Sequence, residues 1–219
     1  TIRYTIDIYY GGVEGNKYSL VMRCDACGMF EVLNLYLKSD ATRAFEDWIT
    51  EMRDNPLFSE LPYQLVFMLI TDNDGAWSEE NDEWQRMIAN HSICMRYVST
   101  DRHEDENGAG EFTCMWYRVK SMLFHRNLPP SWWQRCSNAL KFLLNRFPVT
   151  SDDVAVSIDG DQVRPLEVFT RFWYSRRQID RELSYYVGPG EVCIVHDTSI
   201  DGSSLQPKVR WGFSLGSMH

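Results

Sequence analysis

Hydrophobic and polar residues alternate with two different periods along this chain, and the changes of period predict an alternation of strands and helices. Three β-branched and aromatic runs fill residues 3–37, and segments rich in Gly, Asn and Asp separate them. Runs of this kind with turn residues between them are typical of antiparallel strands. The start of the chain therefore predicts a meander of three antiparallel strands.

A helix and several further elements follow the meander. Apolar residues at helical spacing predict a helix over 40–55, with Ser39 as its N-cap and Pro56 after its end. The continuous apolar run that follows is typical of a parallel strand covered on both faces. In chain order the pattern predicts a strand over 63–72, a helix over 78–90, a strand over 92–99, an acidic surface loop over 100–108, and two helices over 110–127 and 131–147.

The sequence pattern changes after Pro148, where short strand-like segments alternate with turns that contain Gly, Asp and Pro. We therefore expect a core domain over 1–148 and a β-rich C-terminal extension over 149–219. The composition, with 44% hydrophobic and 24% charged residues, is that of a globular protein. No stretch is long and apolar enough to span a membrane, so we expect no membrane association.

Cysteine usage and net charge narrow the possible functions. The six cysteines are scattered and lie mostly in apolar runs, which indicates a reduced, intracellular protein. Cys24 and Cys27 have zinc-knuckle spacing, but no second pair follows, and we interpret them as core residues. The net charge of −9 argues against a general polyanion binder, because neutralising phosphates requires a basic surface.

Three carboxylates occupy positions that suggest chemistry. The order of elements is that of the ribonuclease H-like nucleases, which implies an α/β fold with a mixed five-stranded sheet, three antiparallel strands then two parallel, flanked by helices. Ligands of such sheets gather at the carboxyl ends of parallel strands. Asp7 lies inside the first strand, Asp72 ends the fourth, and Glu111 begins the helix after the acidic loop.

Asp is rare in strands, and a carboxylate there must be paired, hydrogen-bonded or bound to a metal. Carboxylates that converge on one spot repel one another unless a dication neutralises them, and hard oxygen ligands suit Mg²⁺ or Mn²⁺. Two such ions support in-line phosphoryl displacement without a His or Lys base. We therefore predict Asp7, Asp72 and Glu111 as the catalytic and metal-binding residues.

Five short sequence motifs add a family resemblance. In order, the segments GNKYSLVMRCD, LYLKSDATRAFEDW, TDNDGAW, ENGAGEF and LPPSWWQRCSNALKFLLNRFP resemble the integrase catalytic core of Ty1/copia-type retrotransposons. The similarity covers about residues 4–148. Asp7, Asp72 and Glu111 fall on the family's Asp, Asp and Glu, and the last segment matches its Asn-Arg-x-Pro ending through Asn145, Arg146 and Pro148.

The resemblance implies a DDE-type integrase, a nuclease and transferase that processes the 3′ ends of a retrotransposon's DNA and carries out strand transfer for DNA integration. It implies two Mg²⁺ or Mn²⁺ ions, DNA ends and target DNA as partners, nuclear localisation, and a homodimer or higher oligomer formed through helices. For nucleic-acid binding we predict five basic residues: Lys120, Arg118, Lys141, Arg176 and Arg177.

Three positions depart from the family. Asp74 replaces the usual Gly of the turn, Ala76 replaces an acid, and Phe112 stands where a basic residue commonly follows the Glu. These changes and the excess of acidic over basic residues leave a second hypothesis open. In this hypothesis the chain is a catalytically decayed or domesticated module that acts as a protein-interaction scaffold. A hydrolytic nuclease of another ribonuclease H-like family is a third, weaker alternative.

Overall fold

The computed structural model describes residues 3–11, 17–55, 68–72, 75–98, 109–148, 157–158, 161–162, 164–169, 175–196 and 209–214. For 109–111, 157–158, 161–162, 192–196 and 209–213 it describes the backbone alone. The predicted acidic loop 100–108 and the first half of the strand predicted over 63–72 lie outside these ranges.

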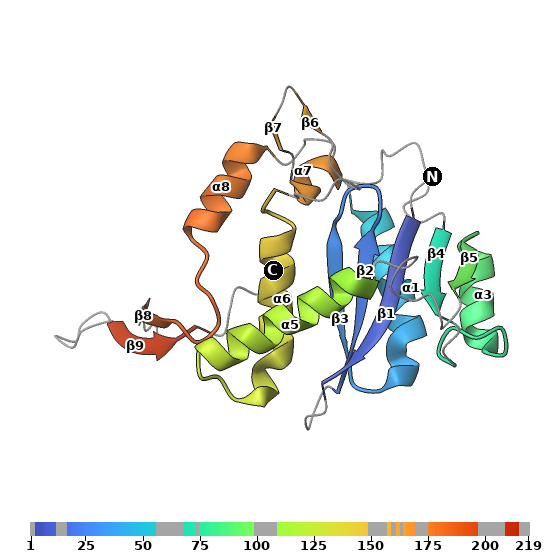
Figure 1. Ribbon diagram of the computed structural model, residues 1–219, viewed down its shortest axis with the longest axis horizontal. Helices are drawn as coiled ribbons and strands as arrows, with labels where there is room; N and C mark the ends of the chain where they lie inside the picture. The colour runs from blue at the N-terminus through green and yellow to red at the C-terminus, as the bar shows by residue number, and fades with distance from the viewer. Residues whose placement is uncertain are drawn as a thin grey trace.

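A mixed five-stranded sheet forms the centre of the molecule, as predicted (Figure 1). Neighbouring strands follow the order β3-β2-β1-β4-β5. The β1–β2 and β2–β3 pairs are antiparallel, whereas the β1–β4 and β4–β5 pairs are parallel. The strands are β1 (Arg3–Tyr10), β2 (Tyr18–Cys24), β3 (Phe30–Leu35), β4 (Met68–Asp72) and β5 (Cys94–Val98).

Helices cover both faces of this sheet (Figure 1). Helices α1 (Ala41–Asp54) and α3 (Asp82–Asn90) pack on one face, and α5 (Ala109–His125) and α6 (Trp133–Leu144) pack on the other. The alternation of side chains along each strand supplies apolar residues to both layers. The predicted fold class is therefore confirmed.

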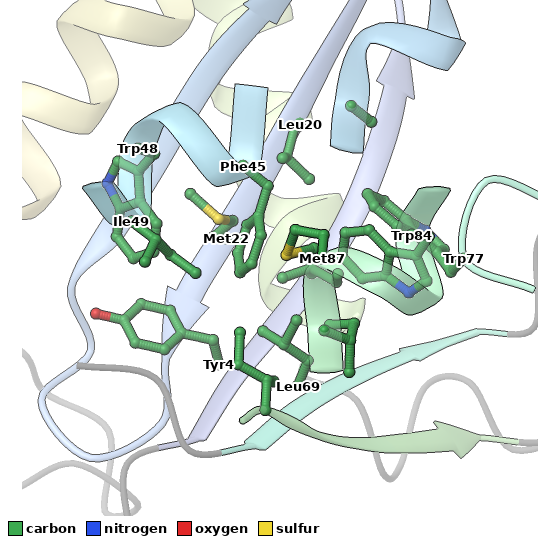
Figure 2. Close-up of a cluster of buried hydrophobic side chains, with 14 of the residues drawn as sticks. Tyr4, Leu20, Met22, Phe45, Trp48, Ile49, Leu69, Trp77, Trp84 and Met87 are labelled. Carbon is green, nitrogen blue, oxygen red and sulfur yellow. The ribbon is translucent and has the colours of Figure 1, made fainter. Parts of the chain in front are cut away.

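The core under α1 and α3 is rich in aromatic residues, as Figure 2 shows. Trp77 and Trp84 lie with ring centroids 4.6 Å apart, and Phe45 of α1 contacts Trp84 at 5.6 Å. Tyr4 of β1 meets Trp48 edge to face at 5.5 Å. Aromatic pairs of this kind add stabilisation beyond the area they bury. They connect α1 and α3 to each other and to the central strand β1.

The second core joins α5 and α6 to the first three strands. Phe112 of α5 meets Phe30 of β3 edge to face, with centroids 6.1 Å apart. Trp133 of α6 lies so close to the chain after β1 that a Cβ on Gly11 would clash with its ring. The absence of a side chain at Gly11 therefore allows α6 to pack against the end of β1.

The C-terminal extension contains two helices as well as short strands. Strands β8 (Val192–His196) and β9 (Val209–Phe213) form an antiparallel pair, and β6 (Ser157–Ile158) pairs with β7 (Asp161–Gln162). Between them lie the helices α7 (Pro165–Phe169) and α8 (Arg176–Ser184). Its independence as a domain stays a prediction.

Three helices begin differently from the sequence pattern. Ser39 is not the N-cap of α1, because residues Lys38–Asp40 form the 3₁₀ turn η1, and the Asp40 carboxylate accepts a hydrogen bond from the Leu37 N–H at 2.8 Å. Asn81 caps α3, so this helix starts later than predicted. The 3₁₀ turn η3 (Pro130–Trp132) precedes α6. At each of these starts, a nearby polar side chain accepts a hydrogen bond from a free backbone N–H, or a Pro lacks that N–H altogether.

Asn145, just after α6, fastens this helix to the edge strand β3. Its side-chain oxygen accepts from the Phe30 N–H at 2.7 Å, and its side-chain nitrogen donates to the Phe30 carbonyl at 2.8 Å. The amide thus occupies the place of a neighbouring strand at Phe30 and is itself 4% exposed. This contact gives a structural role to the Asn of the family-like ending.

We predict that Asn145→Ala lowers the free energy of unfolding by about 3 kcal/mol, because both Phe30 backbone groups lose their partner in a buried place. Urea denaturation followed by tryptophan fluorescence measures the change. Asn138→Ala on the same helix is the matched control and should change the value by less than about 0.5 kcal/mol. Equal losses in the two variants would contradict the anchoring role.

Candidate functional site

The candidate site lies where the connections of the sheet reverse direction. From β1 the chain proceeds to β2 and β3 on one side, whereas the parallel strands β4 and β5 lie on the other side. Ligands of open α/β sheets bind beside such a switch point, outside the carboxyl ends of the parallel strands. Asp7 and Asp72 belong to the two strands that border it, β1 and β4.

The two carboxylates share one face of the sheet. The parallel register pairs Thr5 with Ile70, and carrying it two residues further along both strands brings Asp7 level with Asp72. Side chains at matched positions of neighbouring strands point to the same face. The direct partner of Asp7 on β2 is Val21, which belongs to the core under α5 and α6. Both aspartates therefore lie on the face that carries α5.

Both aspartates are half-buried and hydrogen-bonded locally. Asp7 Oδ1 accepts from the Ile8 N–H at 2.7 Å, and the Thr71 hydroxyl lies 3.4 Å from Asp72 Oδ1. A half-buried carboxylate at a strand end remains accessible to a cation while the sheet limits its freedom. This arrangement suits a preformed half of a metal site.

The N-terminal half of α5, which contains Glu111, packs on the face of the sheet that carries Asp7. Tyr9, two residues after Asp7 on the same face, is hydrogen-bonded to Thr113 and stacks on Trp116, with ring centroids 5.7 Å apart. Burial raises the pKa of Tyr9, the Asp7 charge raises it further, and the Thr113 bond lowers it in part. Tyr9 therefore stays neutral and ties the start of α5 to β1.

Glu111 itself is part of α5, but its side chain lies outside the described atoms. Within the described part of the chain, no three His, Cys, Asp or Glu side chains form a cluster that could hold a metal ion. The structure thus places Asp7 and Asp72 on one face of two neighbouring strands, and it places the Glu111 backbone on α5, which packs on that face. The three-carboxylate site stays a prediction.

Four of the predicted nucleic-acid contacts are exposed: Lys120, Arg118, Arg176 and Arg177. Lys120 lies over the rings of Trp116 and Tyr117, 5.5 and 5.6 Å from their centroids. Arg118 and Arg177 are also exposed, on α5 and α8. These side chains are available to phosphate groups.

Two of the predicted contacts, the half-buried Lys141 and the exposed Arg176, already have carboxylate partners. Lys141 Nζ lies 2.6 Å from Glu31 Oε1, and this pair links α6 to β3. Arg176 Nε donates to Glu167 at 3.0 Å, and Glu167 is only 2% exposed. Their assignment to DNA stays a prediction, and the structure adds a packing role that sequence spacing does not reveal.

Cys24 and Cys27 are buried in the turn between β2 and β3, as interpreted from the sequence. A hydrogen bond from Cys27 is the main reason why the pKa of Cys24 is lowered to about 7, whereas the same bond and burial raise the pKa of Cys27. Four tryptophans of the described residues are buried in the core: Trp48, Trp77, Trp84 and Trp133.

Tyr9 is the site residue that sequence reasoning missed. It is an aromatic residue two positions after Asp7 in an alternating strand, so its presence on the face of Asp7 follows from the strand period. Its partners on α5 are more than a hundred positions away and give no local signal.

No protein-family model and no curated protein matches the chain. Solved structures do resemble it. A chain of the cryo-EM structure of the simian T-cell lymphotropic virus intasome in complex with PP2A regulatory subunit B56 gamma has a TM-score of 0.54 and 13% sequence identity, over 76% of this chain and 53% of that chain. The structure of the HTLV-2 integrase catalytic core domain in complex with magnesium (dimeric form) has a TM-score of 0.47 and 16% identity, over 76% of this chain and 94% of that chain.

The likeness to the intasome chain concerns the fold, which here is a mixed five-stranded sheet flanked by helices. The chain spans about half the length of the intasome chain that it resembles. No helix among the described residues has the length and apolar character needed to cross a membrane.

We predict that Lys141→Met lowers the free energy of unfolding by about 1–2 kcal/mol, because the half-buried Glu31 carboxylate loses its cation. The matched control is Lys120→Met, whose exposed ammonium should contribute less than about 1 kcal/mol. Urea denaturation of both variants measures the difference. If the two losses are the same, the packing role of Lys141 is wrong.

Proposed function

We propose that this chain is the catalytic core of a metal-dependent polynucleotidyl transferase of the DDE type. It would trim the 3′ ends of a retroelement's DNA and then join them to target DNA, as the resemblance to Ty1/copia-type integrases implies. The observation that carries the proposal is the convergence of Asp7 and Asp72 on one face at the switch point between β1 and β4. The integrase-like fold supports it.

The donor set fits Mg²⁺ or Mn²⁺, because it consists of hard carboxylate oxygens. Asp7 would contact both ions, Asp72 would hold one and Glu111 the other. Bound there, the ions would activate the attacking oxygen and stabilise the leaving one. The chain's own contribution is to hold Asp7 and Asp72 on two paired strands and to bring Glu111 to them on α5, whose first turn Tyr9 fastens.

DNA would approach along α5, where the exposed Lys120 and Arg118 follow the predicted catalytic Glu111. Arg177 on α8 would contact more distant phosphates. Lys141 and Arg176 would reach DNA only by exchanging their present carboxylate partners for phosphates. The acidic net charge of −9 implies that these few cations need help from other basic regions for tight binding. The DNA substrate would place the protein in the nucleus.

We further propose that copies of the chain associate into a dimer or higher oligomer through α5. Phe124 and Tyr117 on this helix are 83% and 64% exposed. Large aromatic side chains left in water on one helix favour a protein contact.

Calorimetric titration with Mn²⁺ tests the metal site without the need for a DNA substrate. The natural sequence should bind Mn²⁺, and Asp72→Asn and Asp7→Asn should each remove the binding, because an amide oxygen carries no charge to offset dehydration of the ion. Asp47→Asn is the matched control, since this carboxylate is 75% exposed on α1, on the opposite face of the sheet.

Catalysis is measured separately, as Mn²⁺-dependent nicking of a labelled duplex oligonucleotide, which Asp72→Asn should abolish. Metal binding without nicking would favour an inactive module that retains the site. Absence of Mn²⁺ binding to the natural sequence would overturn the enzymatic proposal and favour the protein-interaction scaffold, whose partner a pull-down with the folded chain would then identify.

Sedimentation velocity tests the association. We expect a concentration-dependent dimer, and Phe124→Ser should shift it toward monomer, because this ring gives up the most exposed area. Tyr36→Ser is the control, since Tyr36 is 61% exposed but lies after β3, away from α5. A chain that remains monomeric at high concentration would refute the proposal.

A further inference from the structure

A cavity of about 440 Å³ lies between the second half of α5, α6 and the segment 186–191. Figure 1 shows the chain after α8 running beside α6 and reaching the end of α5, where β8 begins. The carboxylate site involves the first turn of α5, whereas the cavity begins at Arg118 and continues to Leu128. The cavity is therefore separate from the candidate catalytic site.

The interior of this cavity is apolar. Side chains from both helices and from their connection form most of its surface, and the ring of Tyr186 closes one side. Gly190, with φ of 78°, allows the segment 186–191 to approach Leu128 closely, because a Cβ at Gly190 would stand 2.6 Å from Leu128 Cδ2. The apolar lining residues from α5, the connection and α6 are Met122, Leu128, Leu140 and Leu143.

The rim of the cavity carries an excess of cationic and donor groups. Arg118, His125 and Arg126 lie along it on one side of α5, and Glu191 is the only carboxylate among the lining residues. Glu191 pairs with Arg126 at 2.5 Å, which leaves the Arg118 guanidinium without an ion pair in the described part of the chain. Lys120, by contrast, lies over Trp116 and does not line the cavity.

The wall formed by 186–191 is held by contacts on both sides. Tyr186 stacks on Phe142 with centroids 5.0 Å apart, and Arg146 binds Glu182 of α8 at 2.8 Å. Arg126 and Glu191 close the other end. A cavity with fixed walls on three elements is largely preformed, and this lowers the ordering cost of binding a ligand.

We propose that this cavity binds an amphipathic organic anion, a small molecule with a hydrophobic body and a single carboxylate or sulfonate group. The hydrophobic body would fill the space between the helices, and the anion would lie at the rim beside Arg118 and His125. The volume is that of a small-molecule site, at the lower end of the usual range of roughly 300–1,000 Å³. This cavity contains none of the predicted catalytic carboxylates, but it shares Arg118 with the proposed DNA-binding surface.

Fluorescence titration with 1-anilinonaphthalene-8-sulfonate tests the proposal, with circular dichroism to show that each variant is folded. We expect saturable binding of one equivalent that decanoate displaces and decanol displaces at least about fivefold less well, as the loss of one partly exposed charge contact implies. Arg118→Glu should weaken binding by about tenfold, and Ser121→Trp, which puts an indole at the exposed rim, should block it.

Arg43→Glu is the matched control for charge reversal, because Arg43 is 84% exposed on α1, on the opposite face of the sheet, and binding should be unchanged. Equal binding by all three variants would overturn the proposal, because the probe would then lie elsewhere. Equal displacement by decanol and decanoate would also overturn it, as would displacement by a hydrophobic peptide but not by decanoate.

Discussion

The pleat of β1 fixes both cores and the candidate site. β1 lies at the centre of the sheet, paired with antiparallel β2 and parallel β4, so its register is held from both sides. A slip by one residue would exchange the faces of all of its side chains. Tyr4 and Ile6 would then leave the core under α1, and Asp7 would enter it. Because an unpaired carboxylate in an apolar core is costly, Asp7 itself opposes the wrong register.

The sequence contains enough information for the sheet, because the periods of the hydrophobic pattern are local. An Asp within an apolar strand and another at a strand end are visible in the same way, so Asp7 and Asp72 could be predicted before their strands were known to be neighbours. Contacts between distant parts of the chain could not be predicted. The hydrogen bond between Asn145 and Phe30 joins residues 115 positions apart, and no local sequence pattern predicts it. The first residue of a helix could not be predicted for another reason. Ser39 and Asp40 are both residues whose side chains can bond the nearby backbone N–H groups, and only the packed turn decides which of the two does so.

The basic residues show why the density of charge in a sequence is a poor guide to a binding surface. Arg176 is close to Arg177 and Arg181 in the sequence, yet its guanidinium pairs with the buried Glu167. In a protein with net charge −9, carboxylates are abundant enough to engage many of the cations. Ion pairs of this kind connect elements of the second half of the chain to each other and to the sheet: Lys141–Glu31, Arg126–Glu191, Arg146–Glu182 and Arg164–Asp180.

Asn145 and Arg146, which follow α6, connect this helix to the sheet and to the C-terminal extension. Asn145 covers the outer edge of β3 at Phe30, where free backbone groups would otherwise be open to another strand. The next residue, Arg146, lies over the Phe142 ring at 3.7 Å and binds Glu182 of α8. One residue thus holds α6 to the sheet, and the other holds the C-terminal extension to α6. Since α5 packs on α6 in the same core, the position of the first turn of α5 beside Asp7 depends on this anchor. The motif therefore supports the candidate chemistry from a distance, by positioning the helix that carries Glu111.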